Sequence, residues 1–186
     1  MASPTHLVIL VAALSGYHRG FRSHTDEEMA AFLHRFYCLA EDVITEAGGQ
    51  IIKFLGDAVL AVFDEAAATN AVAAAVTMET SAAALARDVG LEMRLGANLH
   101  AGEAMLTELG QGSSRRLDVI GRAVNQTFLM GRGAGIRVSE RVYRKLPSGD
   151  RSPWDKHKPP AVYVLGESAQ PYASLRKTAE ENAARW

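Results

Sequence analysis

Residues 51–63, with the sequence IIKFLGDAVLAVF, constrain the fold more than any other stretch of the chain. Two short apolar runs flank Gly56 and Asp57, and a Gly-Asp pair between apolar runs is typical of a β-hairpin. Lys53 interrupts the first run, although burying an unpaired ammonium group is costly. The stretch therefore predicts a hairpin whose lysine and turn aspartate face something other than a closed core.

The rest of the chain predicts an α+β fold with helices packed on an antiparallel-rich sheet. Residues 6–14 form an apolar run typical of a buried strand, and residues 26–49 have helical spacing, with Thr25 and Glu28 as a capping box. The further expected elements are an alanine-rich helix over 64–90, a long bent strand and a return strand over 91–109, a strand and helix over 117–133, a strand and short helix over 135–146, and a last strand over 161–165.

Composition narrows the class of protein. The 186 residues are 48% hydrophobic and 22% charged, as in ordinary globular domains, and they suit one domain over residues 1–166 with a polar tail or appended helix over 167–186. A formal charge of −1 argues against nucleic acid as an obligate partner, and no apolar run is long enough for membrane insertion. The single cysteine, Cys38, fits a reducing compartment, so a cytoplasmic location is expected.

Five motifs lie along the chain in a fixed order: HLVILVAALSGY, EAGGQIIKFLGDAVLAVF, LEMRLGANLHAGEAM, DVIGRAVNQ and IRVSERVY. As an ordered set, over about residues 6–165, they resemble the class III nucleotidyl cyclase catalytic domain, the adenylate and guanylate cyclase homology family. The resemblance implies a ferredoxin-like fold for residues 1–166 and a head-to-tail dimer with nucleotide sites at its interface.

The resemblance assigns two residues to base recognition. Lys53 matches the purine-selecting position, where a lysine donates to adenine N1 and guanylate cyclases carry glutamate instead. Asp118 matches its acidic partner, which accepts from the adenine amino group. The pair implies ATP rather than GTP as the ligand, and the alternative interpretation is a structural ion pair at a dimer interface.

Two further residues match the part of the family's site that carries out the chemistry. In the family, two aspartates hold two divalent ions, and the facing chain supplies an asparagine and an arginine. Asp57 matches the second metal aspartate, which implies Mg²⁺ or Mn²⁺ as a cofactor, and Asn125 matches the ribose-orienting asparagine. The alternatives are an ordinary turn aspartate and a helix-surface amide.

Two positions depart from the family's pattern. Ala13 stands where the first strand of the family carries its other metal aspartate, and Leu129 stands four residues after Asn125, where the family has its transition-state arginine. A single carboxylate weakens a divalent metal site, and losing such an arginine typically costs several powers of ten in rate. Arg132 is a less favoured substitute for the arginine.

The sequence therefore predicts an adenylate-cyclase-like, nucleotide-binding signalling domain with impaired catalysis, acting as a homodimer or as a heterodimer with another cyclase domain. One alternative is an active adenylate cyclase that converts ATP to cAMP and pyrophosphate, slowly or with a partner chain completing the site. The other is a purely structural interaction module. Lys156 and Lys158 are expected in a solvated turn rather than at a phosphate group.

Overall fold

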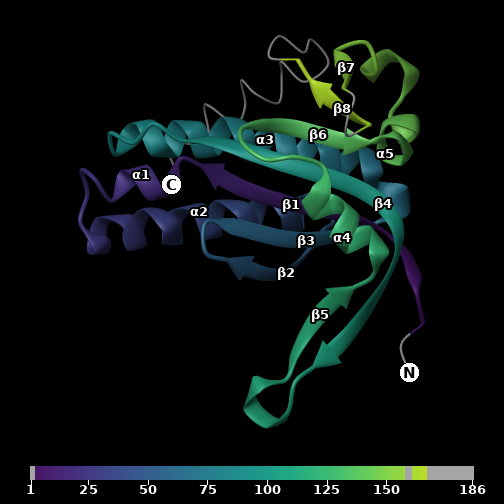
Figure 1. Ribbon diagram of the computed structural model, residues 1–186, viewed down its shortest axis with the longest axis horizontal. Helices are drawn as coiled ribbons and strands as arrows, with labels where there is room; N and C mark the ends of the chain where they lie inside the picture. Colours follow the sequence, from purple (N-terminus) through teal and green to yellow (C-terminus); the bar gives the residue numbers. More distant parts are fainter. Residues whose placement is uncertain (1–2, 158–160, 167–186) are drawn as a thin grey trace.

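An eight-stranded sheet forms the centre of the molecule in the computed structural model, which describes residues 3–157 and 161–166. The strands run in the order β2-β3-β1-β4-β6-β8-β7, and β5 pairs with β4 off this path (Figure 1). Only β4 and β6 pair in parallel among the described strands, so the predicted antiparallel-rich α+β fold is confirmed. The strands are β1 Thr5–Ser15, β2 Gln50–Leu55, β3 Ala58–Asp64, β4 Arg94–Leu109, β5 Arg116–Ile120, β6 Gly135–Ser139, β7 Trp154–His157 and β8 Val162–Leu165.

The first half of the chain forms a ferredoxin-like unit. The chain order β1, α2, β2, β3, α3, β4 and the sheet order β2-β3-β1-β4 are those of a split β-α-β motif. Helix α2 spans Asp26–Glu46 and α3 spans Ala68–Asp88. The predicted capping box is present, because the Glu28 backbone N–H donates to Thr25 Oγ1 at 3.2 Å and the Thr25 N–H donates to Glu28 Oε2 at 2.8 Å.

The two faces of the sheet carry separate hydrophobic cores. Alternate residues of β1 from Val8 to Leu14 pack with α2 and α3, which cover one face. The intervening residues from Leu7 to Val11 pack on the other face with Ala123 and Val124 of α4, which spans Arg122–Leu129. Helix α4 lies over β1 and β4. The second face therefore carries much less helix than the first.

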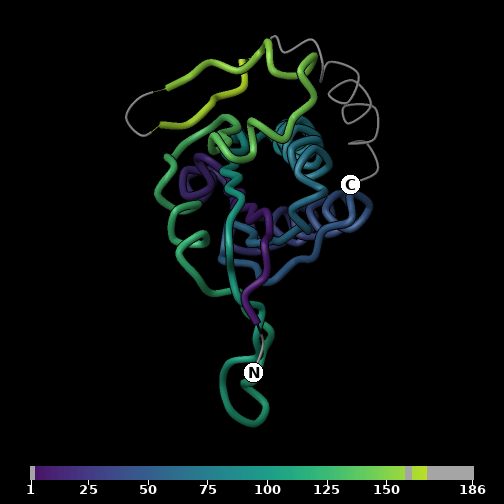
Figure 2. The backbone as a smooth tube through the Cα atoms, turned by 90° about the vertical axis from the view of Figure 1, so that its right-hand side faces the viewer, coloured from purple at the N-terminus to yellow at the C-terminus, as the bar shows by residue number. Residues whose placement is uncertain are grey.

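Strand β4 leaves the sheet and, with β5, forms an arm that projects from the body of the molecule (Figures 1 and 2). The prediction of a return strand within 91–109 is wrong, because β4 runs unbroken to Leu109 and β5 is the return strand. Gly96 and Gly102 serve close packing rather than a turn. A Cβ at Gly96 would lie 2.0 Å from the Gly133 carbonyl oxygen, and one at Gly102 would lie 3.0 Å from Ala123 Cβ.

The last described elements extend the sheet beyond β4. Helix α5 spans Glu140–Lys145, and its predicted cap is present, since Ser139 Oγ accepts from the Val142 N–H at 3.5 Å. Residues 155–157 are exposed, as expected, but the expected turn is wrong, because they lie in β7 paired with β8. There the Lys156 ammonium stands 5.5 Å from the centroid of the Tyr163 ring, a cation–π contact between the two strands. Lys158 and the expected tail at 167–186 lie outside the described residues.

A short helix that the sequence did not indicate, α1 at Tyr17–Gly20, follows β1 directly. Gly16 joins the two with a left-handed backbone, at a φ of 96°, which favours glycine. Within the described ranges, none of the helices combines the length and the apolar character needed to cross a membrane.

Candidate functional site

The lysine inside the hairpin points away from the core under the helices because of a β-bulge. Ile51 and Phe54 pack against the core covered by α2 and α3. The pairing of β2 with β3 shifts register between Ile51 and Lys53, and this shift places Lys53 opposite Leu60, a member of the core on the second face. A bulge commonly redirects a side chain in this way. Lys53 therefore stands on the sparsely covered face.

Lys53 meets Asp118 from the projecting arm. Lys53 Nζ donates to Asp118 Oδ2 at 2.6 Å, although 65 residues separate the two along the chain. The side chains are 40% and 23% exposed, so a ligand can reach both. The structure thus brings together the two residues that the sequence assigned to base recognition.

The Asp118 carboxylate is held in its ionised form. Burial alone would raise its pKa, but hydrogen bonds from Lys53 and from the Val119 N–H (2.8 Å), together with the lysine charge, outweigh burial and lower the pKa below its usual range. An ionised carboxylate only accepts hydrogen bonds, and an ammonium only donates them. The pair therefore presents one donor and one acceptor side by side.

The two positions assigned to metal binding also lie together. The Leu14 N–H donates to the Asp57 carbonyl at 2.9 Å, which joins the end of β1 to the hairpin turn. Ala13 pairs with Ala58, the residue after Asp57. The backbone geometry therefore places the Ala13 methyl beside the turn aspartate, where the family carries a second carboxylate.

Two tyrosines lie close to the Asp57 carboxylate. Burial raises the pKa of Tyr17 and of Tyr37, and the negative charge of Asp57 raises both further. Tyr37 donates to the Gly56 carbonyl at 2.7 Å, and its ring stacks on Phe54 at 3.8 Å between centroids. These contacts fix the hairpin turn that carries Asp57.

The residues around Asp57 do not form a metal site by themselves. Among residues 3–157 and 161–166, no group of three or more His, Cys, Asp or Glu side chains is arranged to hold an ion. Mg²⁺ is commonly held by one or two carboxylates together with substrate phosphates. With Ala13 in place of one carboxylate, Asp57 is the single acidic ligand that the family pattern leaves here.

Helix α4 presents Asn125 and Leu129 on one face, since they are four residues apart. Both are exposed, and Leu129, at 77%, is the most exposed large hydrophobic side chain of the described residues. Within the same residues, the Asn125 side chain has no hydrogen-bond partner. Arg132 lies beyond the end of the helix, and its carbonyl accepts from Arg137 Nη2 at 2.9 Å.

Sequence reasoning missed two residues that hold the end of α4 in place. Asn98 is buried in β4, and its Nδ2 donates to the carbonyls of Thr127 and Gly131, each at 3.0 Å. The Arg137 guanidinium donates to four carbonyls between residues 132 and 135. A lone amide in the apolar strand sequence GANL is the signal that could have indicated Asn98, because buried amides require hydrogen-bond partners.

Sequence reasoning also missed basic residues near the end of β1. A recess of about 280 Å³ is lined there by Ser15, Arg19, Glu92 and Arg94, two basic residues and one acidic residue. Arg94 pairs with Ser15 across β4 and β1, and Arg19 stands against Gly16. These side chains bring positive charge close to the turn that follows β1.

A sequence model of the adenylate and guanylate cyclase catalytic domain matches residues 2–170 of the chain. The chain belongs to this family. The cyclase domain is 27% identical over 158 residues to an adenylate cyclase of Anabaena cylindrica, an alignment that covers 78% of this chain and 32% of the relative. It therefore spans about a third of the length of that relative.

Solved structures show the same fold. The guanylyl cyclase Cya2 superposes with a TM-score of 0.77 at 21% identity, covering 92% of this chain and 97% of that one. The adenylyl cyclase CyaB from P. aeruginosa superposes with a TM-score of 0.78 at 18% identity, covering 91% and 98%. The predicted class III cyclase fold is confirmed, whereas the roles assigned to Lys53, Asp57, Asp118 and Asn125 stay predictions.

Proposed function

We propose that this cyclase domain binds ATP at an interface with a second cyclase domain and that, as a homodimer, it converts ATP to cAMP slowly or not at all. The observation that carries the proposal is the 2.6 Å contact between Lys53 and Asp118 on an accessible face. The contact assembles a donor and an acceptor from two separate elements, as base recognition requires.

The chemistry of the pair favours adenine over guanine. Adenine offers an acceptor at N1 and a donor at its amino group, which match the Lys53 ammonium and the ionised Asp118 carboxylate. Guanine exchanges these roles, with a donor at N1 and an acceptor at O6. Reversing the donor and acceptor leaves polar groups unpaired, which is how such sites reject the wrong ligand.

The impairment follows from Ala13 and Leu129 together. In a homodimer, both composite sites lack one metal carboxylate and the transition-state arginine. In a heterodimer with a complete cyclase chain, each of the two sites still lacks one group. The site that takes its metal aspartates from the complete chain has Leu129 in place of the arginine. The site that takes its arginine from the complete chain has Ala13 in place of one metal aspartate. This domain therefore acts as a nucleotide-binding or regulatory subunit, with Mg²⁺ or Mn²⁺ held weakly through Asp57 and the ATP phosphates.

Exposed apolar side chains support the dimer. They gather on the projecting arm and on α4, and apolar patches of this kind mark contact surfaces. Among the described residues, those on the arm and α4 are Leu109, Leu117, Ile120, Phe128 and Leu129, and two further exposed large hydrophobic side chains, Phe21 and Leu55, lie elsewhere. The partner is a second copy of this domain or another cyclase domain, and residues 1–166 are the unit that we expect to dimerise.

Thermal unfolding in the presence of ATP or GTP tests the proposal. ATP should raise Tm, because a ligand that binds the native state stabilises it, and GTP should raise Tm less. Lys53→Ala should abolish the ATP effect. Lys145→Ala is the matched control, since Lys145 is also partly exposed and pairs with a carboxylate, Glu65, at 3.1 Å. An unchanged Tm with ATP in the wild-type protein would leave the structural interaction module as the function.

A further inference from the structure

A cleft lies beside α4, apart from the proposed nucleotide site. Its volume is about 690 Å³, and its walls come from the start of β1, the middle of β4, the first half of α4 and α5. None of Lys53, Asp57, Asp118 or Asn125 lines it. Its polar and charged lining residues are His6, His100, Glu103, Arg122, Gln126 and Arg141.

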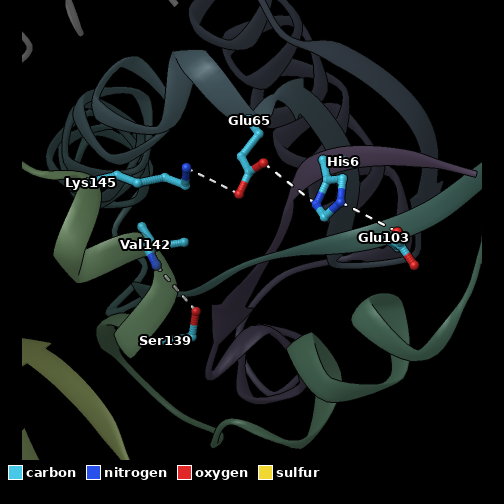
Figure 3. Close-up of polar contacts among 6 residues, drawn as sticks. All are labelled: His6, Glu65, Glu103, Ser139, Val142 and Lys145. Carbon is cyan, nitrogen blue, oxygen red and sulfur yellow. Dashed lines mark hydrogen bonds and ion pairs between the residues drawn. The ribbon is translucent and has the colours of Figure 1, made fainter.

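The cleft has an excess of unpaired positive charge. Arg122 begins α4 and Arg141 lies on α5, and neither has a hydrogen bond or ion pair within the described part of the chain. The acidic side chains nearby, Glu65 and Glu103, contact His6 rather than either arginine. His6 lies 3.4 Å from Glu103 and 3.5 Å from Glu65, and Glu65 also pairs with Lys145 at 3.1 Å (Figure 3). Two guanidinium groups therefore line the cleft together with one carboxylate, Glu103, which contacts His6 and neither arginine, so positive charge is in excess.

His100 shows that the Arg141 charge reaches into the same space. Burial lowers the pKa of His100, and the positive charge of Arg141 lowers it further. The imidazole is half-buried and neutral, so it offers a hydrogen bond without adding to the charge.

The first turn of α4 adds backbone donors to the cleft. Gly121 precedes α4 and provides no side-chain cap. The backbone N–H groups in the first turn of α4 therefore have no side-chain acceptor at the cap position. Gly121, Arg122 and Ala123 all line the cleft. Helix N-termini favour anions, and guanidinium groups bind phosphate and carboxylate oxygens in pairs.

We propose that this cleft binds the phosphate group of a small phosphorylated molecule between Arg122, Arg141 and the first turn of α4, with His100 as a neutral hydrogen-bonding partner. Two guanidinium groups together with backbone N–H groups offer more donors than the two oxygens of a carboxylate accept. Met105 lines the cleft as well, and it gives the organic part of the ligand an apolar surface. Arg122 and Gln126 share α4 with Asn125, so the ligand would contact the helix that carries the proposed ribose-orienting residue.

Titration calorimetry with inorganic phosphate, phenyl phosphate and acetate at constant ionic strength tests this site. Inorganic phosphate should saturate one site with a dissociation constant on the order of 1 mM. Phenyl phosphate should bind more tightly than inorganic phosphate, and acetate should bind more weakly. Arg122→Gln and Arg141→Gln should each weaken phosphate binding by about tenfold, the effect of one lost charge-assisted hydrogen bond.

Matched variants separate this cleft from the nucleotide site. Arg144 lies on α5 with Arg141 and forms a surface ion pair with Glu140. Arg144→Gln removes this pair and should leave phosphate binding unchanged. Lys53→Ala should leave it unchanged as well. In the wild-type protein, phosphate should also raise the pKa of the His100 imidazole, which an NMR titration measures. The cause is the negative charge that phosphate adds beside the imidazole. The other charged or titratable residues that line the cleft with His100 are Arg122, Arg141, His6 and Glu103.

Three results would overturn the proposal. They are phosphate binding that survives both arginine substitutions, acetate binding as tight as phosphate binding, and a His100 signal that phosphate does not move. The His100 titration uses the wild-type protein, so it decides the question even if a variant fails to fold.

Discussion

The two halves of the proposed nucleotide site are preserved to different degrees. The base-selecting half has a direct 2.6 Å contact between Lys53 Nζ and Asp118 Oδ2. The Val119 N–H donates a hydrogen bond to the other carboxylate oxygen, Asp118 Oδ1. The metal half keeps Asp57 but has a methyl group at Ala13. Binding a base and stabilising a transition state draw on different groups, so a domain can keep the first capacity while losing the second.

In the proposed metal half, backbone contacts join β1 to the hairpin turn although Ala13 carries no carboxylate. The hydrogen bond from Leu14 to Asp57 still joins β1 to the hairpin turn, and Gly16 still takes a left-handed backbone before α1. The same holds for α4, where Asn98 and Arg137 fix the segment that follows Leu129. The difference between the halves therefore lies in two side chains, which substitution can restore.

Restoring both side chains should give the largest effect. Ala13→Asp combined with Leu129→Arg should raise cAMP formation from ATP by several orders of magnitude, on the order of 10³-fold or more, because the arginine and second carboxylate stabilise charge in the transition state. Initial rates with Mn²⁺ and Mg²⁺ measure the effect. Ala13→Asn with Leu129→Gln is the uncharged control and should remain at the wild-type rate. A wild-type rate already equal to that of the double variant would refute the impairment.

Reversing the charge of the base-selecting lysine should give the next largest effect. Lys53→Glu should weaken ATP binding by about ten- to a hundredfold, since a charge-assisted donor is replaced by an acceptor, and it should reduce the preference for ATP over GTP. Calorimetric titration with each nucleotide measures both changes. Lys145→Glu reverses a lysine beside a different carboxylate and should leave nucleotide binding unchanged. Equal losses in the two variants would show a general effect of charge rather than base recognition.

The acid titration of Asp118 should report the same ion pair without nucleotide. Because its pKa is lowered in the folded protein, the carboxylate contributes stability above the pKa of the unfolded chain. That contribution should disappear as the pH falls through the folded pKa. In Lys53→Ala, the Asp118 pKa measured by carbon NMR should rise and the acid-induced fall in Tm should become shallower. An unchanged Asp118 pKa in that variant would mean that the ion pair does not form in solution.

The smallest expected effect concerns the tyrosines beside the metal half. Asp57→Asn should lower the pKa of Tyr17 and of Tyr37, because the carboxylate charge contributes to both. The change should be modest, since burial is the larger cause and remains. Tyrosinate absorbance during an alkaline titration measures it, with Asp64→Asn at the exposed end of β3 as the control. If only the control shifts the tyrosines, Asp57 does not face them.

Local signals in the sequence predicted much of the fold. The capping box at Thr25, the hairpin at residues 51–63 and the cap at Ser139 each depend on residues close together in the chain, and all three are present. The continuous run of β4 was not predicted, because Gly96 and Gly102 read locally as bends. Their real role is close contact with Gly133 and Ala123, which are distant in sequence.

The candidate site shows the same division. The motifs indicated Lys53 and Asp118, but their contact depends on how the arm carries β5 back toward β2, which no local pattern specifies. The β-bulge that turns Lys53 toward that contact was equally hidden, because it is defined by pairing with β3. The roles of Asn98 and Arg137 were missed because their partners are backbone carbonyls. Every residue has a carbonyl, so the sequence does not indicate which ones these side chains contact.

Measuring cAMP formation from ATP by the purified wild-type chain at high concentration, with Mn²⁺ and then Mg²⁺, tests the central claim most directly. Lys53→Ala serves as the parallel control. The predicted result is little or no cAMP above that control, from a wild-type protein whose Tm ATP nevertheless raises. Wild-type turnover that Lys53→Ala abolishes and that is as fast as in the Ala13→Asp, Leu129→Arg variant would contradict the claim, and it would establish an active cyclase whose missing aspartate and arginine are supplied by other residues.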